Sequence, residues 1–76
     1  MEGTLGQNIR KLRKERGLTQ EALAEAALGG NQSQLSRYEN DVWTPSLDSL
    51  IRIAQALNCQ LSDLIYVTSS TQEVLA

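Results

Sequence analysis

The segment from residue 32 to residue 40 carries side chains that can read nucleic-acid bases. At about 100° per residue, a helix here would display two amides, two hydroxyls and one guanidinium on one face, with no carboxylate. These residues are Gln32, Ser33, Ser36, Arg37 and Asn40. Glutamine can pair with adenine N6/N7 and arginine with guanine O6/N7, while serine suits base edges or phosphate. The alternative is an ordinary solvent face, although carboxylates and lysines usually occupy such faces. We therefore predict that Gln32, Ser33, Ser36 and Arg37 read bases.

Other chemistries find little support in the sequence. The chain of 76 residues has no histidine and a single cysteine, which excludes an ordinary zinc site, a catalytic triad and an internal disulfide. Asp41, Asp48 and Asp63 form no convincing dyad, and the Gly-Gly pair at 29–30 suits a turn better than a phosphate-binding loop. Cys59 is most simply a small buried hydrophobe, the alternative being a redox sensor. We expect no enzyme activity, no catalytic residue, no metal and no cofactor.

Helical periodicity and capping residues predict the elements that position the base-reading face. The expected helices cover about residues 4–15, 19–27, 31–40, 46–57 and a short segment bearing Leu61, Leu64 and Ile65. Thr4 and Gln7 form a capping box, Asn31 caps the third helix with Gln34 reaching back to it, and Asn58 is a left-handed terminator. We predict an all-α fold, a compact five-helix bundle, with a domain over residues 1–66 and a C-terminal tail over 67–76.

The second and third of these helices, joined by a glycine-containing turn, have the form of a helix-turn-helix unit. In that unit the second helix can enter the major groove of DNA. The first helix has its apolar residues Leu5, Ile9 and Leu12 on one stripe, and we expect its basic residues to lie away from that stripe.

The charge of the chain is polarised along its length. Residues 10–37 hold six basic and three acidic side chains, a net charge of +3, whereas residues 38–76 hold one basic and five acidic side chains, a net charge of −4. The six basic residues are Arg10, Lys11, Arg13, Lys14, Arg16 and Arg37. A total charge of −2 argues against a nucleic-acid binder, but a partner that meets the first half sees a basic surface.

Four motifs together resemble a known family. They are LTQEALA at residues 18–24, QSQLSRYEN at 32–40, PSL at 45–47 and IAQAL at 53–57. Their order and spacing resemble the phage-repressor/Cro-type helix-turn-helix regulators, the Xre-like family, over roughly residues 5–66. The resemblance implies a lambda-repressor-like DNA-binding domain that acts as a repressor-like transcriptional regulator. Such a protein would bind double-stranded operator DNA as a homodimer.

The resemblance also implies roles for single residues. Gln20 would contact a phosphate and brace the first residue of the third helix, while Arg10 and Asn40 would hold backbone phosphates. Gln32, Ser33 and Arg37, with Ser36 nearer the flank, would face the major groove. The helix N-termini at Thr19 and Asn31 also suit phosphate because of the helix dipole.

Two departures from the family pattern concern the turn and the loop that flank the third helix. The turn is one residue longer and has Gly30 where an apolar residue normally packs, a contact that Leu28 could replace. The loop after the third helix lacks the usual glycine and basic residues, which puts a phosphate clamp there in doubt. Trp43 in that loop is expected to be a packing or interface residue rather than a nucleic-acid contact.

A dimer would double the short recognition surface, and the broad apolar arc of the fourth helix is the candidate interface. We predict that Ile53, Leu57, Leu61, Leu64 and Ile65 form it, with Ile53 the residue left over from the core. Simple core packing is the alternative for all five residues. A second functional hypothesis is an antitoxin-like or other protein-interaction module that uses the same scaffold to bind a protein partner. No membrane-spanning segment is evident, so a small soluble cytoplasmic protein is expected.

Overall fold

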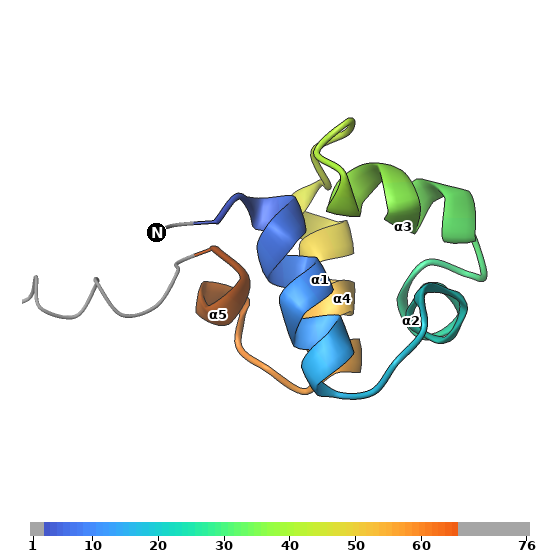
Figure 1. Cartoon of the computed structure of the whole chain (residues 1–76), viewed down its shortest axis with the longest axis horizontal. Helices are drawn as coiled ribbons and strands as arrows, with labels where there is room; N and C mark the ends of the chain where they lie inside the picture. The colour runs from blue at the N-terminus through green and yellow to red at the C-terminus, as the bar shows by residue number, and fades with distance from the viewer. Residues whose placement is uncertain (1–2, 66–76) are drawn as a thin grey trace, which may run out of the picture.

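The computed structural model describes residues 3–65, which form five α-helices and no strand. Their bounds are α1 (Leu5–Glu15), α2 (Gln20–Ala27), α3 (Gln32–Glu39), α4 (Leu47–Leu57) and α5 (Leu61–Ile65). Each of the first four begins within one residue of its expected position. Figure 1 shows α1 and α4 at the centre, α2 and α3 on one side of them and α5 on the other. The predicted all-α, five-helix fold is therefore confirmed.

Side-chain caps fix where the helices begin. Thr4 makes the predicted capping box with Gln7, and Thr19, Asn31 and Ser46 each accept a hydrogen bond from a backbone N–H three residues later. Each cap supplies an acceptor to a donor that the helix itself leaves without a partner. The prediction for Gln34 was wrong, because its side chain donates to the Tyr38 hydroxyl instead of returning to Asn31.

Helix α4 ends as the sequence indicates. Asn58 adopts the left-handed conformation with φ 58° and ψ 46°, and its N–H bonds back to the last turn of the helix. Asparagine tolerates this conformation better than most residues. The chain then turns into α5, which packs against α1 through the buried side chain of Asn8. Its Nδ2 donates to the carbonyl of Leu64 over 2.8 Å.

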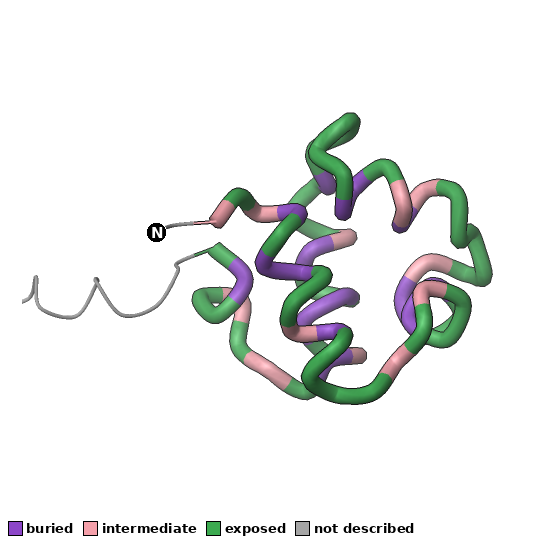
Figure 2. The backbone as a smooth tube through the Cα atoms, viewed as in Figure 1, coloured by how far each residue is buried: buried purple, intermediate pink, exposed green. Residues whose placement is uncertain are grey.

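The core lies between α1, α2, α3 and α4 and is closed by α5 (Figure 2). Its buried apolar residues are Ile9, Leu23, Ala24, Ala27, Leu35, Tyr38, Leu50, Ile53, Ala54, Leu57 and Leu64. Ile53, Leu57 and Leu64 have no exposed surface at all, so the prediction that Ile53 would be left over for an interface was wrong. The physical reason is that α1, α2 and α5 all pack against α4, and Ile53 lies on the part of its apolar arc that they enclose.

Glycine is required where the first turn of α1 meets the end of α3. A Cβ atom on Gly6 would collide with the carbonyl oxygen of Tyr38 and lie 2.7 Å from that of Glu39. The missing side chain therefore lets the two backbones approach. It also lets the Gly6 N–H donate to the Asp41 carboxylate over 3.1 Å.

The C-terminal tail at residues 67–76 lies outside the described residues. Among residues 3–65, no helix has the length and apolar character that crossing a membrane requires.

Candidate nucleic-acid interface

The outward face of α3 is the one that the helical spacing predicts. Gln32, Ser33 and Arg37 are exposed, as is Asn40 directly after the helix, and Ser36 is half-buried. Leu35 and Tyr38 point into the core. The helix is thus anchored on one side and presents amide, hydroxyl and guanidinium groups on the other.

The acidic residue of α3 does not disturb this face. Glu39 is only 2% exposed, and its carboxylate forms a two-point contact with the guanidinium of Arg13. Nε donates to Oε2 over 2.6 Å and Nη2 to Oε1 over 3.0 Å. The negative charge on α3 is therefore buried and paired, so the exposed surface of the helix carries only the positive charge of Arg37.

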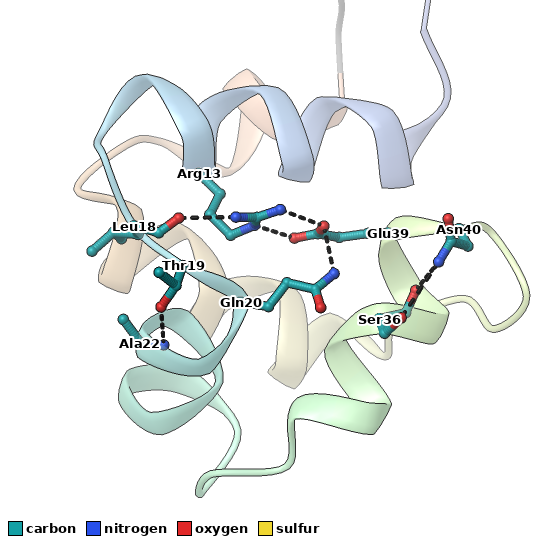
Figure 3. Close-up of polar contacts among 8 residues, drawn as sticks. All are labelled: Arg13, Leu18, Thr19, Gln20, Ala22, Ser36, Glu39 and Asn40. Carbon is teal, nitrogen blue, oxygen red and sulfur yellow. Dashed lines mark hydrogen bonds and ion pairs between the residues drawn. The ribbon is translucent and has the colours of Figure 1, made fainter.

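Arg13 is the centre of a polar network that joins three helices (Figure 3). Its Nη1 donates to the carbonyl of Leu18 in the turn before α2, and Gln20 Nε2 donates to Glu39 Oε1 over 3.0 Å. The network ties the end of α3 both to α1 and to the start of α2. The bidentate arginine–carboxylate contact is directional and orients the end of α3 on α1, while the single bond from Gln20 links α2 to the same carboxylate.

Two expectations about these residues were wrong. Arg13 was expected to lie on the outer, basic side of the first helix, but it is 8% exposed. Gln20 was expected to brace Gln32, but its amide contacts Glu39 at the other end of α3. The helical spacing indicates that both residues of the ion pair face the core. Arg13 lies one turn after the core residue Ile9, and Glu39 lies one turn after the core residue Leu35.

The N-termini of α2 and α3 are both near the surface. Thr19 Oγ1 accepts from the N–H of Ala22, and Asn31 Oδ1 accepts from the N–H of Gln34, each over 3.0 Å. The N–H groups of Gln20 and the residue after it have no partner among the described residues. Such groups, together with the helix dipole, attract phosphate.

The long turn between α2 and α3 is accommodated by its two glycines. Gly29 and Gly30 have φ values of +64° and +88°, which favour glycine. The N–H of Gly30 donates to the carbonyl of Ala24, and Leu28 packs against the core. Leu28 thus supplies the apolar contact that Gly30 cannot make, and α3 starts directly after the Asn31 cap.

Asp41 fastens the loop after α3 to α1. Asp41 adopts φ +60°, and its carboxylate accepts from Thr4 Oγ1 over 2.6 Å and from the N–H of Gly6. The N–H groups of Val42 and Trp43 both point to the carbonyl of Arg37. Trp43 is half exposed, and its ring centroid lies 4.8 Å from Cζ of Arg37. Trp43 lies outside the core, so whether it is an interface residue, as the sequence suggests, stays a prediction.

The remaining basic residues divide into structural and exposed groups. Arg16 Nε donates to the carbonyl of Leu57 at the end of α4, so this side chain serves the fold. Arg10, Lys11 and Lys14 are exposed on α1. Arg10 lies one turn after Gly6, which contacts the end of α3, and it therefore flanks the α3 side of the molecule. The basic surface is smaller than the charge count suggests.

Asn40 lies at the edge of the α3 face. Its Nδ2 donates to the carbonyl of Ser36 over 2.9 Å, an arrangement drawn in Figure 3. The same carbonyl also accepts from the Asn40 backbone N–H, and Asn40 Nδ2 lies 3.4 Å from the Ser36 hydroxyl oxygen, to which it also donates.

No group of three or more metal-ligating side chains gathers in the part of the chain that the structure describes. Cys59 is half-buried and packs against the core. Burial raises the pKa of the Cys59 thiol, the nearby Asp63 raises it further, and Arg16 opposes them. A thiol of this kind behaves as a small hydrophobe rather than a reactive nucleophile.

Comparison with known proteins places the chain among regulators. A helix-turn-helix family model matches residues 9–64. An immunity repressor of Bacillus phage phi105 is 45% identical over 62 residues, which cover 82% of this chain and 42% of the repressor. The chain thus spans less than half the length of that relative. An uncharacterised HTH-type transcriptional regulator of Sinorhizobium fredii, y4dJ, is 38% identical over 71 residues, covering 93% of this chain and 91% of the relative.

A solved structure supports the same assignment. The biofilm master regulator SinR of Bacillus subtilis, crystallised in complex with DNA, matches with a TM-score of 0.74 and 35% identity. The match covers 80% of this chain and 97% of the SinR chain. Family and fold are those of regulators and not of enzymes. The chain therefore belongs to the helix-turn-helix family of phage-repressor-type, DNA-binding transcriptional regulators.

Proposed function

We propose that this protein is a sequence-specific regulator that binds a two-fold operator in double-stranded DNA as a homodimer. The observation that carries the proposal is the exposed face of α3, which has hydrogen-bonding side chains, one guanidinium and no carboxylate. Gln32, Ser33, Ser36 and Arg37 read base edges in the major groove. The buried contact between Arg13 and Glu39 holds α3 against α1, and Gln20 ties the same carboxylate to α2.

Phosphate contacts supply most of the affinity and position α3 in the groove. The N-termini of α2 and α3, capped by Thr19 and Asn31, lie beside the phosphates of the DNA strands. Gln20 donates its backbone N–H to one of these phosphates. Arg10 and Asn40 add contacts at the flanks. With so few exposed basic groups, non-specific binding is weak.

Arg37→Ala tests the role of α3. If Arg37 makes a bidentate contact with guanine, the variant loses about 1–3 kcal/mol of binding free energy at one base-pair position only. Arg52→Ala is the matched control, because Arg52 is an exposed arginine on α4 whose partner is Asp48. A uniform loss across all DNA sequences, with a shallower salt slope, would instead assign Arg37 to a phosphate.

Selection of bound sequences from a random pool of double-stranded DNA tests specificity and symmetry together. We expect an inverted repeat with half-sites about one helical turn, or about 10 base pairs, apart. Enrichment of a single half-site would overturn the dimer and keep the base-reading role. No enrichment at about 50 mM salt would overturn the proposed function.

The proposed dimer surface is now smaller than the sequence suggests, because Ile53, Leu57 and Leu64 lie in the core. Leu61 and Ile65 remain, one turn apart on the same face of α5, and Ile65 is 48% exposed. Ile65→Glu should shift sedimentation from dimer towards monomer without unfolding the chain. An unchanged dimer would show that α5 is not the interface.

A protein-binding role is the second candidate, favoured by the exposure of Val42, Trp43 and Leu47 at or near the loop after α3. SinR has also been solved in a complex with the protein SinI. Such a role is compatible with DNA binding. It becomes the leading function only if the DNA selection described above enriches nothing.

A further inference from the structure

The contact between Trp43 and Arg37 joins the loop after α3 to the base-reading face. Cζ of Arg37 lies over the ring, 4.8 Å from its centroid, which is well within the range of a cation–π interaction. Among residues 3–65, no carboxylate pairs with Arg37. The tryptophan ring is therefore the neighbour that holds this guanidinium.

The backbone builds this contact into the fold. The N–H of Val42 donates to the carbonyl of Arg37 over 2.9 Å and that of Trp43 over 3.3 Å, so the loop folds back onto the residue that its ring touches. The Asp41 carboxylate fixes the other side of the loop to α1, and Pro45 after it is buried. The position of Trp43 relative to α3 is thus set at both ends of the loop.

A cation–π contact restrains a guanidinium without requiring any of its hydrogen bonds. The contact is made at Cζ, and no side-chain hydrogen bond of Arg37 is found among residues 3–65, so its N–H donors stay available to a base. An unrestrained arginine side chain on a surface loses considerable rotamer freedom when it binds. A side chain that is held in advance loses less.

We propose that Trp43 is a positioning residue for base recognition, which holds the Arg37 guanidinium in the orientation that reads one base pair of the operator. The inference rests on the proposed function and extends it to a residue outside α3. Trp43 itself makes no base contact. It acts on sequence discrimination at the single position that Arg37 reads.

A double-mutant cycle on the selected operator tests the coupling. Trp43→Leu should weaken binding about two- to fivefold, the range expected for an exposed cation–π contact, and Trp43→Phe should weaken it less. In an Arg37→Gln background, Trp43→Leu should have no further effect. Val42→Ala is the matched control on the same loop and should bind as the wild type does.

Discrimination provides a readout that a purely structural role would not move. Trp43→Leu should relax the base preference at the same position as Arg37→Gln and at no other. Thermal unfolding of each variant shows whether the fold is intact. Losses that simply add in the cycle, or relaxed preference at several positions, would overturn the role of Trp43.

The free protein separates failure of this inference from failure of the proposed function. Trp43 is the single tryptophan of the chain, so Arg37→Gln should change its fluorescence without DNA, whereas Lys14→Gln, which removes a charge further along α1, should not. Equal spectra would overturn the contact itself. A wild-type chain that binds no DNA would overturn the proposed function and the role of Trp43 together. DNA binding without coupling would overturn only the role of Trp43.

Discussion

Substitution of Glu39 by glutamine tests whether the buried ion pair determines the stability of the fold. The change removes the charge that faces Arg13 and leaves a guanidinium that is 8% exposed without its counter-charge. Removal of one partner of a buried ion pair costs about 3–5 kcal/mol. A chain of this size has a total unfolding free energy of about 4–11 kcal/mol. Glu39→Gln should therefore remove a large fraction of the stability.

Urea unfolding followed by far-ultraviolet circular dichroism measures this loss. Arg52→Gln is the control, because it breaks an exposed pair with Asp48 of 3.2 Å that lies on the surface of α4. We expect that control to cost less than about 1 kcal/mol. A loss of unfolding free energy below about 1 kcal/mol for Glu39→Gln as well would refute the reasoning. It would mean that the Glu39 carboxylate plays no role in compensating the buried charge of Arg13.

The double variant Arg13→Met with Glu39→Leu separates burial from orientation. With both charges replaced by apolar side chains, at least half of the lost stability should return, because no isolated charge stays in the interior. The Gln20 amide and the carbonyl of Leu18 then lose their partners. We therefore expect weaker DNA binding than in the wild type even where the fold is recovered. If the losses of unfolding free energy of Arg13→Met alone and Glu39→Leu alone add up to that of the double variant, direct coupling between the two side chains is contradicted.

Three further outcomes follow from packing and burial. Ile53→Glu should destabilise the fold by more than about 4 kcal/mol in thermal unfolding, because the side chain is fully enclosed, and a folded monomer would contradict this burial. Gly6→Ala should lower the unfolding free energy by about 1–3 kcal/mol, because a Cβ atom has no room beside the carbonyl of Tyr38. Alanine is the better helix former, so without this clash the change would stabilise the helix. A gain in stability in urea would therefore disprove the close approach. Iodoacetamide should alkylate Cys59 more slowly than a free cysteine at pH 8, because the raised pKa of the Cys59 thiol leaves less thiolate. The difference in rate should shrink as the pH rises above that pKa. An equal rate at pH 8 would count against burial of the thiol.

Much of the fold follows from local sequence. Caps such as Thr19, Asn31 and Ser46, together with apolar spacing, predict four helices to within one residue, because a helix begins where a side chain can satisfy its first N–H groups. The outward face of α3 also follows from local sequence, because helical geometry alone places Leu35 and Arg37 on different sides of the helix. These features depend on residues within a few positions of one another.

The tertiary structure decides how charged and apolar residues are used once the helices pack. Spacing alone does not tell that Arg13 and Glu39, 26 positions apart, meet in the interior, or that Ile53 is fully buried. The contact of Trp43 with Arg37 likewise depends on how the loop after α3 closes. The sequence by itself determines the helices and the chemistry of their faces, whereas only long-range packing determines which charges are buried and which side chains share an exposed face.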